Sequence, residues 1–221
     1  MIETLPRIIE AAPDKPELAG PDHPIRQVTR QIAFAPDAWT RERAAKVMEL
    51  FDGLAPEWHT RQTAGRLDSL RDALARGQVP EAGFCVEIGS GTGAGTRYLT
   101  ERFESVVALD LSMEMLKRAP VDRGQRVQAD AADMPIPSGT AQVIVLVNAF
   151  LFPSEIARVL APEGVVVWVS SLGDRTPIYL SAQDVATALP GEWTGCAAVA
   201  GWGSWCVLGR RLEMQVGGNG R

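Results

Sequence analysis

The sequence has few cysteines and histidines, and this scarcity limits the chemistry open to it. There are three cysteines and two histidines in 221 residues. Cys85, Cys196 and Cys206 are too few and too scattered for a framework of disulfide bonds. Neither these cysteines nor His23 and His59 have the spacing of zinc ligands. We therefore expect neither a disulfide-stabilised scaffold nor a metal site.

Long apolar runs and a basic surface are also missing. The longest apolar run, from Val143 to Phe152, is interrupted by Asn148 and is far shorter than the roughly 18 residues of a membrane span. The N-terminal residues lack the basic and apolar regions of a secretory signal. The formal net charge of -5, with no cluster of Lys and Arg, argues against nucleic-acid binding. We expect a cytoplasmic protein with no membrane span and no nucleic-acid partner.

The part of the chain before residue 81 changes character once. Residues 1–36 contain six of the fifteen prolines, which predicts an extended arm with at most a short helical piece. From Thr40, the expected N-cap, apolar residues recur at helical spacing. A second amphipathic helix is expected from about Thr60 to Arg76. We expect residues 37–80 to form a helical cap or lid.

After the cap, short apolar runs alternate with helical stretches. This alternation is typical of a doubly wound, mostly parallel α/β sheet with helices on both faces. The last two apolar runs are separated by only three residues, 201–203, which is hairpin spacing and therefore antiparallel. We expect residues 81–211 to form the sheet domain and residues 212–221 a flexible tail. The expected strands lie at 84–88, 106–109, 126–129, 143–147, 165–169, 194–200 and 204–209.

A glycine-rich segment follows the first of these strands. Residues 89–94, Gly-Ser-Gly-Thr-Gly-Ala, fit the G-x-G-x-x-G/A fingerprint, in which glycines permit positive φ and let a ligand approach the backbone. Asp110 lies about twenty residues further on, at the end of the second strand, where an acid binds ribose hydroxyls. A dinucleotide-dependent enzyme is therefore one interpretation.

Glu87, two residues before the first glycine, favours a different ligand. Its carboxylate at the end of the first strand suits an ammonium group and repels a pyrophosphate. S-adenosylmethionine has an ammonium and a sulfonium but no phosphate. Here the chain resembles the class I S-adenosylmethionine-dependent methyltransferases, whose first motif reads acid-x-Gly-x-Gly-x-Gly.

Three further segments are similar to the same family. Residues 107–116 resemble the second strand, its ribose-binding acid and the following helix. Residues 128–135 resemble the loop that meets the adenine. Residues 158–164 resemble the turn into the fifth strand, with Glu163 where the family usually has Gly. The fourth strand departs from the pattern, because Ala141 begins it where an Asp is usual.

Upstream, residues 51–59 resemble the segment that caps the cofactor in small-molecule members such as the ubiquinone/menaquinone-type methyltransferases. His59 replaces the acid of that segment. The family resemblance implies a Rossmann-like sheet of seven strands in the order 3-2-1-4-5-7-6, with strand seven antiparallel. It also implies S-adenosylmethionine as cofactor and S-adenosylhomocysteine as product.

The candidate site residues follow from the motifs and the resemblance. His59 suits a general base, and Asn148 lies at the end of the fourth strand, where open α/β sheets bind their ligands. These two are the candidate catalytic residues. The candidate cofactor-binding residues are Trp58, Arg61, Glu87, Gly89, Ser90, Gly91, Thr92, Gly93, Asp110, Leu111, Asp130, Ala131 and Asn148.

Each candidate also has a plain structural interpretation. The glycines can form a turn without a ligand, and Asp110 can cap the next helix. Asp130 can begin an Asx turn, Asn148 can cap the segment that follows it, and His59 can be an exposed or helix-capping residue. The sequence leaves these interpretations open.

The absence of several motifs narrows the range of possible methyl acceptors. There is no Asn/Asp-Pro-Pro-aromatic segment for amino methylation of bases or amides, no Pro-Cys pair for cytosine C5 chemistry, and no acidic cluster after the fourth strand for magnesium-dependent chemistry. We expect transfer of a methyl group to an O, N or C nucleophile of a small molecule. An NAD(P)-dependent oxidoreductase is disfavoured by Glu87 and by the lack of a Tyr-x-x-x-Lys pair. The sequence also leaves open that the protein binds the cofactor without catalysing a reaction. It leaves open as well whether the protein is a homodimer.

Overall fold

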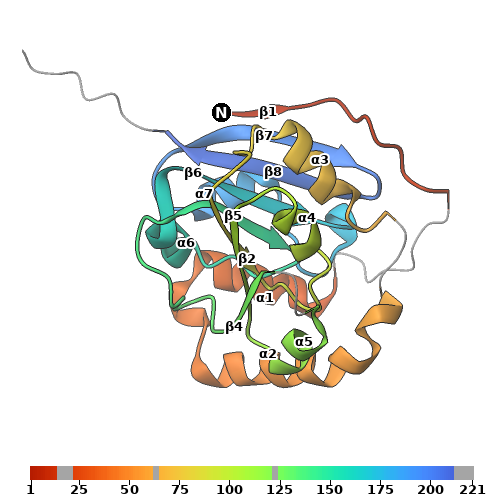
Figure 1. Ribbon diagram of the computed structural model, residues 1–221, viewed down its shortest axis with the longest axis vertical. Helices are drawn as coiled ribbons and strands as arrows, with labels where there is room; N and C mark the ends of the chain where they lie inside the picture. Colours follow the sequence, from red (N-terminus) through yellow and green to blue (C-terminus); the bar gives the residue numbers. More distant parts are fainter. Residues whose placement is uncertain (14–21, 62–64, 121–123, 212–221) are drawn as a thin grey trace, which may run out of the picture.

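The computed structural model describes residues 1–13, 22–61, 65–120 and 124–211, and its centre is one eight-stranded sheet (Figure 1). The expected tail, residues 212–221, lies outside the described residues. The order of the strands across the sheet is β1-β7-β8-β6-β5-β2-β3-β4. The strands are β1 (Ile2–Thr4), β2 (Phe84–Ile88), β3 (Ser105–Asp110), β4 (Gln125–Gln128), β5 (Ala141–Val147), β6 (Leu160–Ser170), β7 (Trp193–Ala200) and β8 (Gly203–Arg210).

The last seven strands confirm the predicted order and the predicted direction of the hairpin. Strand β8 runs antiparallel to both β6 and β7, and the other pairs are parallel. The eighth strand, β1, was not predicted. It pairs in parallel with β7 from Ile2 opposite Gly195 to Thr4 opposite Ala197. These three residues show no alternation of apolar and polar side chains, so the sequence gives no sign of a strand. The backbone groups at the edge of the sheet are enough to pair with them.

The helices are α1 (Pro24–Phe34), α2 (Arg41–Leu54), α3 (Asp68–Arg76), α4 (Thr96–Thr100), α5 (Met113–Arg118), α6 (Pro153–Val159) and α7 (Ala182–Ala188). Short 3₁₀ helices occupy Pro36–Ala38, Ala55–Arg61 and Gly173–Arg175. Thr40 caps α2 as predicted, since its side chain accepts a hydrogen bond from the Arg43 N–H. The prediction of a helix from Thr60 was wrong at its start, because α3 begins only at Asp68. The division of the chain into arm, cap and sheet domain stays a prediction.

Helices cover both faces of the sheet. On one face, buried residues of α1, α6 and α7, such as Ile32, Ile156 and Val185, pack with Trp168 of β6. On the other, α3 and α4 contribute buried residues such as Leu70. Strands buried on both faces explain the unbroken apolar runs in the sequence. No helix in the described ranges is long and apolar enough to cross a membrane.

Helix α2 is packed differently from the others. It has no buried residues, although its N-terminal half and C-terminal half both contribute partly buried apolar side chains. It crosses the molecule beside α5, at the bottom of Figure 1. A long helix without a buried face is weakly held by the core, so its position depends on contacts at its ends.

A buried acid fixes α3 against the sheet. Asp72 is 2% exposed and accepts hydrogen bonds from Arg76 Nε at 2.7 Å and Nη2 at 2.6 Å. It also accepts one from Trp205 Nε1 of β8 at 2.7 Å. Burial raises the pKa of Asp72, but the hydrogen bonds from Arg76 and Trp205 outweigh burial, so the pKa lies below its usual value.

We predict that Asp72→Ala lowers the free energy of unfolding by about 3 kcal/mol, because it leaves a buried indole N–H and a guanidinium without their acceptor. Denaturant unfolding followed by circular dichroism measures this. Glu101→Ala is the matched control, since it breaks an exposed pair with Arg97, also spaced by four residues, and should cost less than about 1 kcal/mol. Equal losses for the two variants would contradict the role given to Asp72.

Candidate active site

A cavity of about 750 Å³ opens at the carboxyl ends of β2, β3 and β5, which is where open α/β sheets bind ligands. Helix α2 and the 3₁₀ segment after it form the opposite wall, with apolar side chains such as Phe51 and Leu54. The candidate residues that line the cavity are Trp58, Glu87, Gly89, Ser90, Gly91, Thr92, Asp110, Leu111, Asp130, Ala131 and Asn148.

The glycine turn after β2 has the conformation that its sequence predicted. Gly89, Gly91 and Gly93 have φ values of +69°, +55° and +80°, which other residues adopt only with strain. A Cβ at Gly89 would also lie 2.7 Å from the Cβ of Ala149. Gly93 does not line the cavity, and its neighbours are Ala119 and Pro120. A glycine is therefore needed at position 93 for the conformation of the turn, and not for contact with a ligand.

Asp110 joins the turn after β2 to the turn after β3. One carboxylate oxygen accepts from the Gly91 N–H at 2.7 Å, and the other accepts from the Ser112 N–H at 2.8 Å. Burial raises the pKa of Asp110, and the backbone hydrogen bonds offset only part of that effect. The carboxylate still has lone pairs to offer to a ligand, since an ionised carboxylate has about four acceptor positions.

Glu87 is the most buried acid of the cavity, at 2% exposure. Thr96 Oγ1 donates to its Oε2 at 2.5 Å. Burial raises the pKa of Glu87 to about 8; the hydrogen bond from Thr96 lowers it, and the charge of Asp110 raises it further. A Cβ at Gly95 would lie 2.3 Å from Glu87 Oε1, so this carboxyl group fits only beside a glycine. A buried acid held in this way favours a cationic group as its partner.

Asp130 already accepts hydrogen bonds from within the protein. Trp39 Nε1 donates to its two carboxylate oxygens at 3.0 and 2.8 Å, and the Ala132 N–H donates to Oδ1 at 2.9 Å. The Trp39 ring also packs against Phe150 and Phe152, with centroids 6.0 and 5.1 Å away. The contact with Ala132 is the Asx turn that the sequence left open. Asp130 can thus serve a ligand only together with Trp39.

Asn148 braces the ends of β5 and β6. It has a φ of +52°, which Asn tolerates better than most residues. Its Nδ2 donates to Ser171 Oγ and its Oδ1 accepts from the Ser171 N–H, both at 2.8 Å. The side chain lines the cavity, but its amide is bonded within the protein. This geometry favours the structural interpretation of Asn148.

Of the two candidates in the segment 55–61 whose side chains the structure describes, one reaches the cavity. Trp58 lines it, and a Cβ at Gly91 would lie 3.7 Å from Trp58 Nε1. His59 is exposed and does not line the cavity. The side chain of Arg61 lies outside the described residues. The structure therefore does not bring the candidate base to the other candidate residues.

Several lining residues were missed by the sequence analysis. Trp39 directly precedes the N-cap of α2, and Phe150 and Phe152 follow β5, so each looked like an ordinary apolar residue. Arg66 lies in the turn before α3 and also lines the cavity, as does His23. No local pattern marks them, because the cavity is assembled from segments far apart in sequence.

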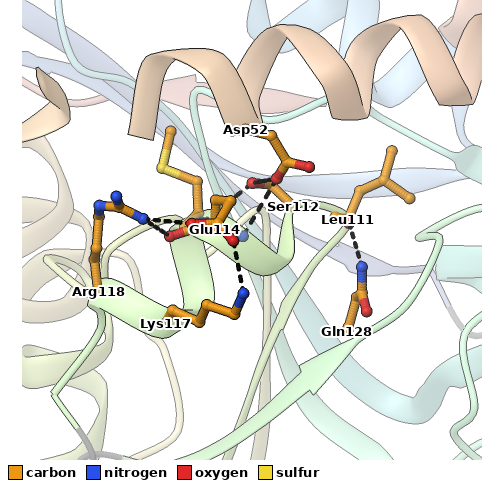
Figure 2. Close-up of polar contacts among 8 residues, drawn as sticks. Asp52, Leu111, Ser112, Glu114, Lys117, Arg118 and Gln128 are labelled. Atoms are coloured by element: carbon orange, nitrogen blue, oxygen red, sulfur yellow. Dashed lines mark hydrogen bonds and ion pairs between the residues drawn. The ribbon is translucent and has the colours of Figure 1, made fainter. Parts of the chain in front are cut away.

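Polar contacts fix the C-terminal end of α2 near the site (Figure 2). Asp52 Oδ1 accepts from Ser112 Oγ at 2.5 Å and from the Glu114 N–H at 3.2 Å. Ser112 Oγ in turn accepts from the Met115 N–H at 3.1 Å and so caps α5. Ser112, two residues after Asp110, is thereby tied to the helix that forms a wall of the cavity.

Comparison with known proteins identifies the domain. Residues 86–168 match the family model described as a methyltransferase domain, and this segment contains Glu87, the glycine turn, Asp110 and Asp130. The chain therefore contains a methyltransferase domain, as its resemblance to the class I S-adenosylmethionine-dependent methyltransferases implied. No curated protein sequence matches it.

Solved structures share the fold of this protein. One is an S-adenosylmethionine-dependent methyltransferase from Aquifex aeolicus, with 16% identity, a TM-score of 0.58, and coverage of 70% of this chain and 97% of that one. Another is DhpI in complex with SAM and HEP, with 19% identity, a TM-score of 0.60, and coverage of 77% and 99%. A chain from the complex of a methyltransferase with the Haloferax volcanii Trm112 activator has 26% identity and a TM-score of 0.48. That match covers 54% of this chain and 59% of the other, so it spans less than two thirds of the relative.

We predict that Gly95→Ala lowers the free energy of unfolding by about 1–3 kcal/mol, because the new methyl group overlaps the buried Glu87 carboxyl group. Denaturant titration measures the change. The control is Gly53→Ala in α2, where a Cβ meets nothing within 4 Å and alanine favours the helix. If both variants were as stable as the parent chain, the close fit between Gly95 and Glu87 would be refuted.

Proposed function

We propose that this methyltransferase transfers the methyl group of S-adenosylmethionine to an uncharged small molecule. One observation supports this most strongly. Glu87 and Asp110, at the ends of adjacent parallel strands, line the same cavity on either side of a glycine turn. Two acids and no bulky side chain in the turn suit a ligand with an ammonium group and ribose hydroxyls, and neither acid is a partner for a pyrophosphate.

The residues present fit the cofactor. Glu87 would accept the ammonium group, Asp110 the ribose hydroxyls, and Asp130 with the Ala131 backbone the adenine edge. Ser90 Oγ lines the cavity, is buried, and has no hydrogen-bond partner in the described part of the chain, so it offers a further polar contact. When bound, the cofactor supplies a methyl group on a sulfonium, which is already a strong electrophile.

The protein's own contribution is placement rather than acid–base chemistry. Asn148 is bonded to Ser171, and His59 lies outside the cavity, so we give neither residue a proton-transfer role. The apolar side chains of α2 and the aromatic group Trp39, Phe150 and Phe152 would exclude water from the reacting atoms. Holding two reactants at attack distance in a water-poor site accelerates a displacement without a dedicated base.

The lining of the cavity away from the glycine turn supports an uncharged acceptor. It consists largely of aromatic and aliphatic side chains, including Trp39, Phe150, Phe152 and Ile178. Among the described residues that line the cavity, Arg66 is the only lysine or arginine, and its guanidinium lies near the ring of Trp58. Thr92 also lines the cavity. An anionic acceptor among the aromatic residues would therefore lack a cation and would lie in a cavity that also contains carboxylates.

We predict that the protein binds S-adenosylmethionine and S-adenosylhomocysteine but not NAD, and that Asp110→Ala weakens both interactions at least about tenfold, since it removes a charge-assisted acceptor. Isothermal titration calorimetry measures the affinities. Asp133→Ala is the control, because Asp133 is exposed and lies outside the cavity. Binding of NAD alone, or unchanged affinity in Asp110→Ala, would sink the assignment. Binding with no methylated product across a screen of cell-extract metabolites would favour a silent cofactor-binding protein.

We also predict that cofactor binding at pH 7 releases a proton, since a carboxyl group with a pKa of about 8 is largely protonated and must ionise to accept an ammonium. The raised pKa makes the neutral form the stable one below pH 8, so affinity rises as pH increases from 6 to 7. Calorimetry in buffers of different ionisation enthalpy counts the protons. Glu87→Gln should release none, and proton release by that variant equal to the parent chain would contradict this origin.

A further inference from the structure

His23 is the one histidine among the described residues that line the cavity. It is the N-cap of α1, and its Nδ1 accepts a hydrogen bond from the Ile25 N–H at 3.2 Å. A ring nitrogen that accepts a hydrogen bond carries no proton, so the proton of this ring lies on Nε2. No described residue accepts a hydrogen bond from Nε2. His23 therefore offers the cavity an N–H donor rather than a basic nitrogen.

The contacts of α1 place His23 beside the loop that follows β6. Arg26, in the first turn of α1, donates from its backbone N–H to the His23 carbonyl at 2.8 Å. Its Nη2 donates to the Thr176 carbonyl at 2.9 Å. Thr176 and Ser171 belong to this loop, and both line the cavity. We call His23, Ser171 and Thr176 the donor region.

The two hydroxyl groups of the donor region resemble His23 in their hydrogen bonding. Ser171 Oγ accepts from Asn148 Nδ2 at 2.8 Å, and Thr176 Oγ1 accepts from the Leu172 N–H at 3.1 Å. In the described part of the chain, neither hydroxyl donates a hydrogen bond. All three side chains thus accept from the protein and keep their own protons for a ligand. A ligand that covered them without supplying acceptors would leave donors unpaired, which costs free energy.

The walls beside the donor region are apolar. Trp39 has a polar N–H group, but this group already donates to Asp130. The Trp39 ring packs against Phe150 and Phe152, and Ile178 lines the same cavity. These walls suit an apolar molecular body, and the donor region suits an oxygen atom on that body.

We propose that the donor region binds a carbonyl oxygen of the methyl acceptor, with His23 Nε2 donating the hydrogen bond. This rests on the proposed function and narrows its substrate class to an apolar molecule with a carbonyl group. The contact forms and breaks no covalent bond, and Nε2 keeps its proton. His23 is thus a specificity residue that orients the acceptor, and not a general base.

The first experiment locates the ring proton. The untagged chain contains only two histidines, so labelling with 15N-histidine gives NMR spectra of two imidazole rings, and His23→Ser identifies one of them by its loss. We expect the proton of His23 on Nε2 and none on Nδ1. A proton on Nδ1 alone would overturn the proposal, because Nε2 could not then donate.

The second experiment uses two probes of nearly the same shape, acetophenone and α-methylstyrene, in which a CH₂ group replaces the carbonyl oxygen. Their affinities are measured by NMR titration of the protein saturated with S-adenosylhomocysteine, so that the cofactor's part of the cavity is filled. Acetophenone should shift the Nε2 signal of His23, and α-methylstyrene should not. The parent chain should prefer acetophenone, and His23→Ser should reduce this preference roughly three- to tenfold.

The variant and its control keep their helices capped. His23→Ser removes the imidazole ring but retains an acceptor for the Ile25 N–H, because serine is among the best N-cap residues. The matched control is Ser181→Asn, which exchanges the N-cap of α7 for another good one. Ser181 does not line the cavity, so this variant should keep the preference of the parent chain.

Each remaining result would overturn the proposal or the function beneath it. If His23→Ser weakened both probes equally, His23 would only pack against the ligand. An unchanged preference in His23→Ser, or its loss in Ser181→Asn as well, would also refute the hydrogen bond. If neither probe bound although S-adenosylhomocysteine did, the substrate class would be wrong and the cofactor site would stand. If S-adenosylhomocysteine itself did not bind, the proposed function would fail.

Discussion

The carboxylate of Asp110 is the contact on which the geometry of the site depends. By accepting from the Gly91 and Ser112 N–H groups, it joins the turn after β2 to the turn after β3. The Gly89 and Ser90 N–H groups add bonds to the Leu109 carbonyl at 2.8 and 3.1 Å. The glycine turn is therefore fixed by its neighbour strand before any ligand binds. Preorganisation of this kind reduces the cost of ordering a binding site.

Burial of acids is the main cost of this arrangement. Glu87 has Thr96 as its hydrogen-bond donor, and its pKa near 8 shows that one neutral hydroxyl does not compensate for lost hydration. Asp72, in α3, has an arginine and an indole as donors, and its pKa is lowered despite burial. Asp72 is satisfied within the fold and acts structurally. Glu87 is not satisfied in this way, which is why we propose it as a binding group.

Much of the fold, and less of the site, could be predicted from the sequence. Buried parallel strands leave unbroken apolar runs, so β2 was predicted with its bounds correct, and the glycine turn and Asp110 were placed correctly beside each other. Strand β1 could not be predicted, because it is only three residues long and joins the edge of the sheet through its backbone, with no pattern of apolar side chains. The contact between Trp39 and Asp130 joins residues 91 positions apart and leaves no local pattern. For the same reason Arg66 was missed as a lining residue, whereas Arg61 and His59 were chosen on motif resemblance.

Helix α2 is packed weakly because it forms a wall of the cavity. Its apolar side chains Val47, Phe51 and Leu54 line the cavity and are only partly buried, although Val47 and Phe51 also pack against the core. Polar contacts hold the helix instead, from Trp39 to Asp130 before its start and from Asp52 to Ser112 near its end. Asp130 and Ser112 follow β4 and β3 respectively, on the loops that line the site. A ligand that fills the cavity would bury the apolar face of α2, and ligand binding and the stability of the helix are therefore linked.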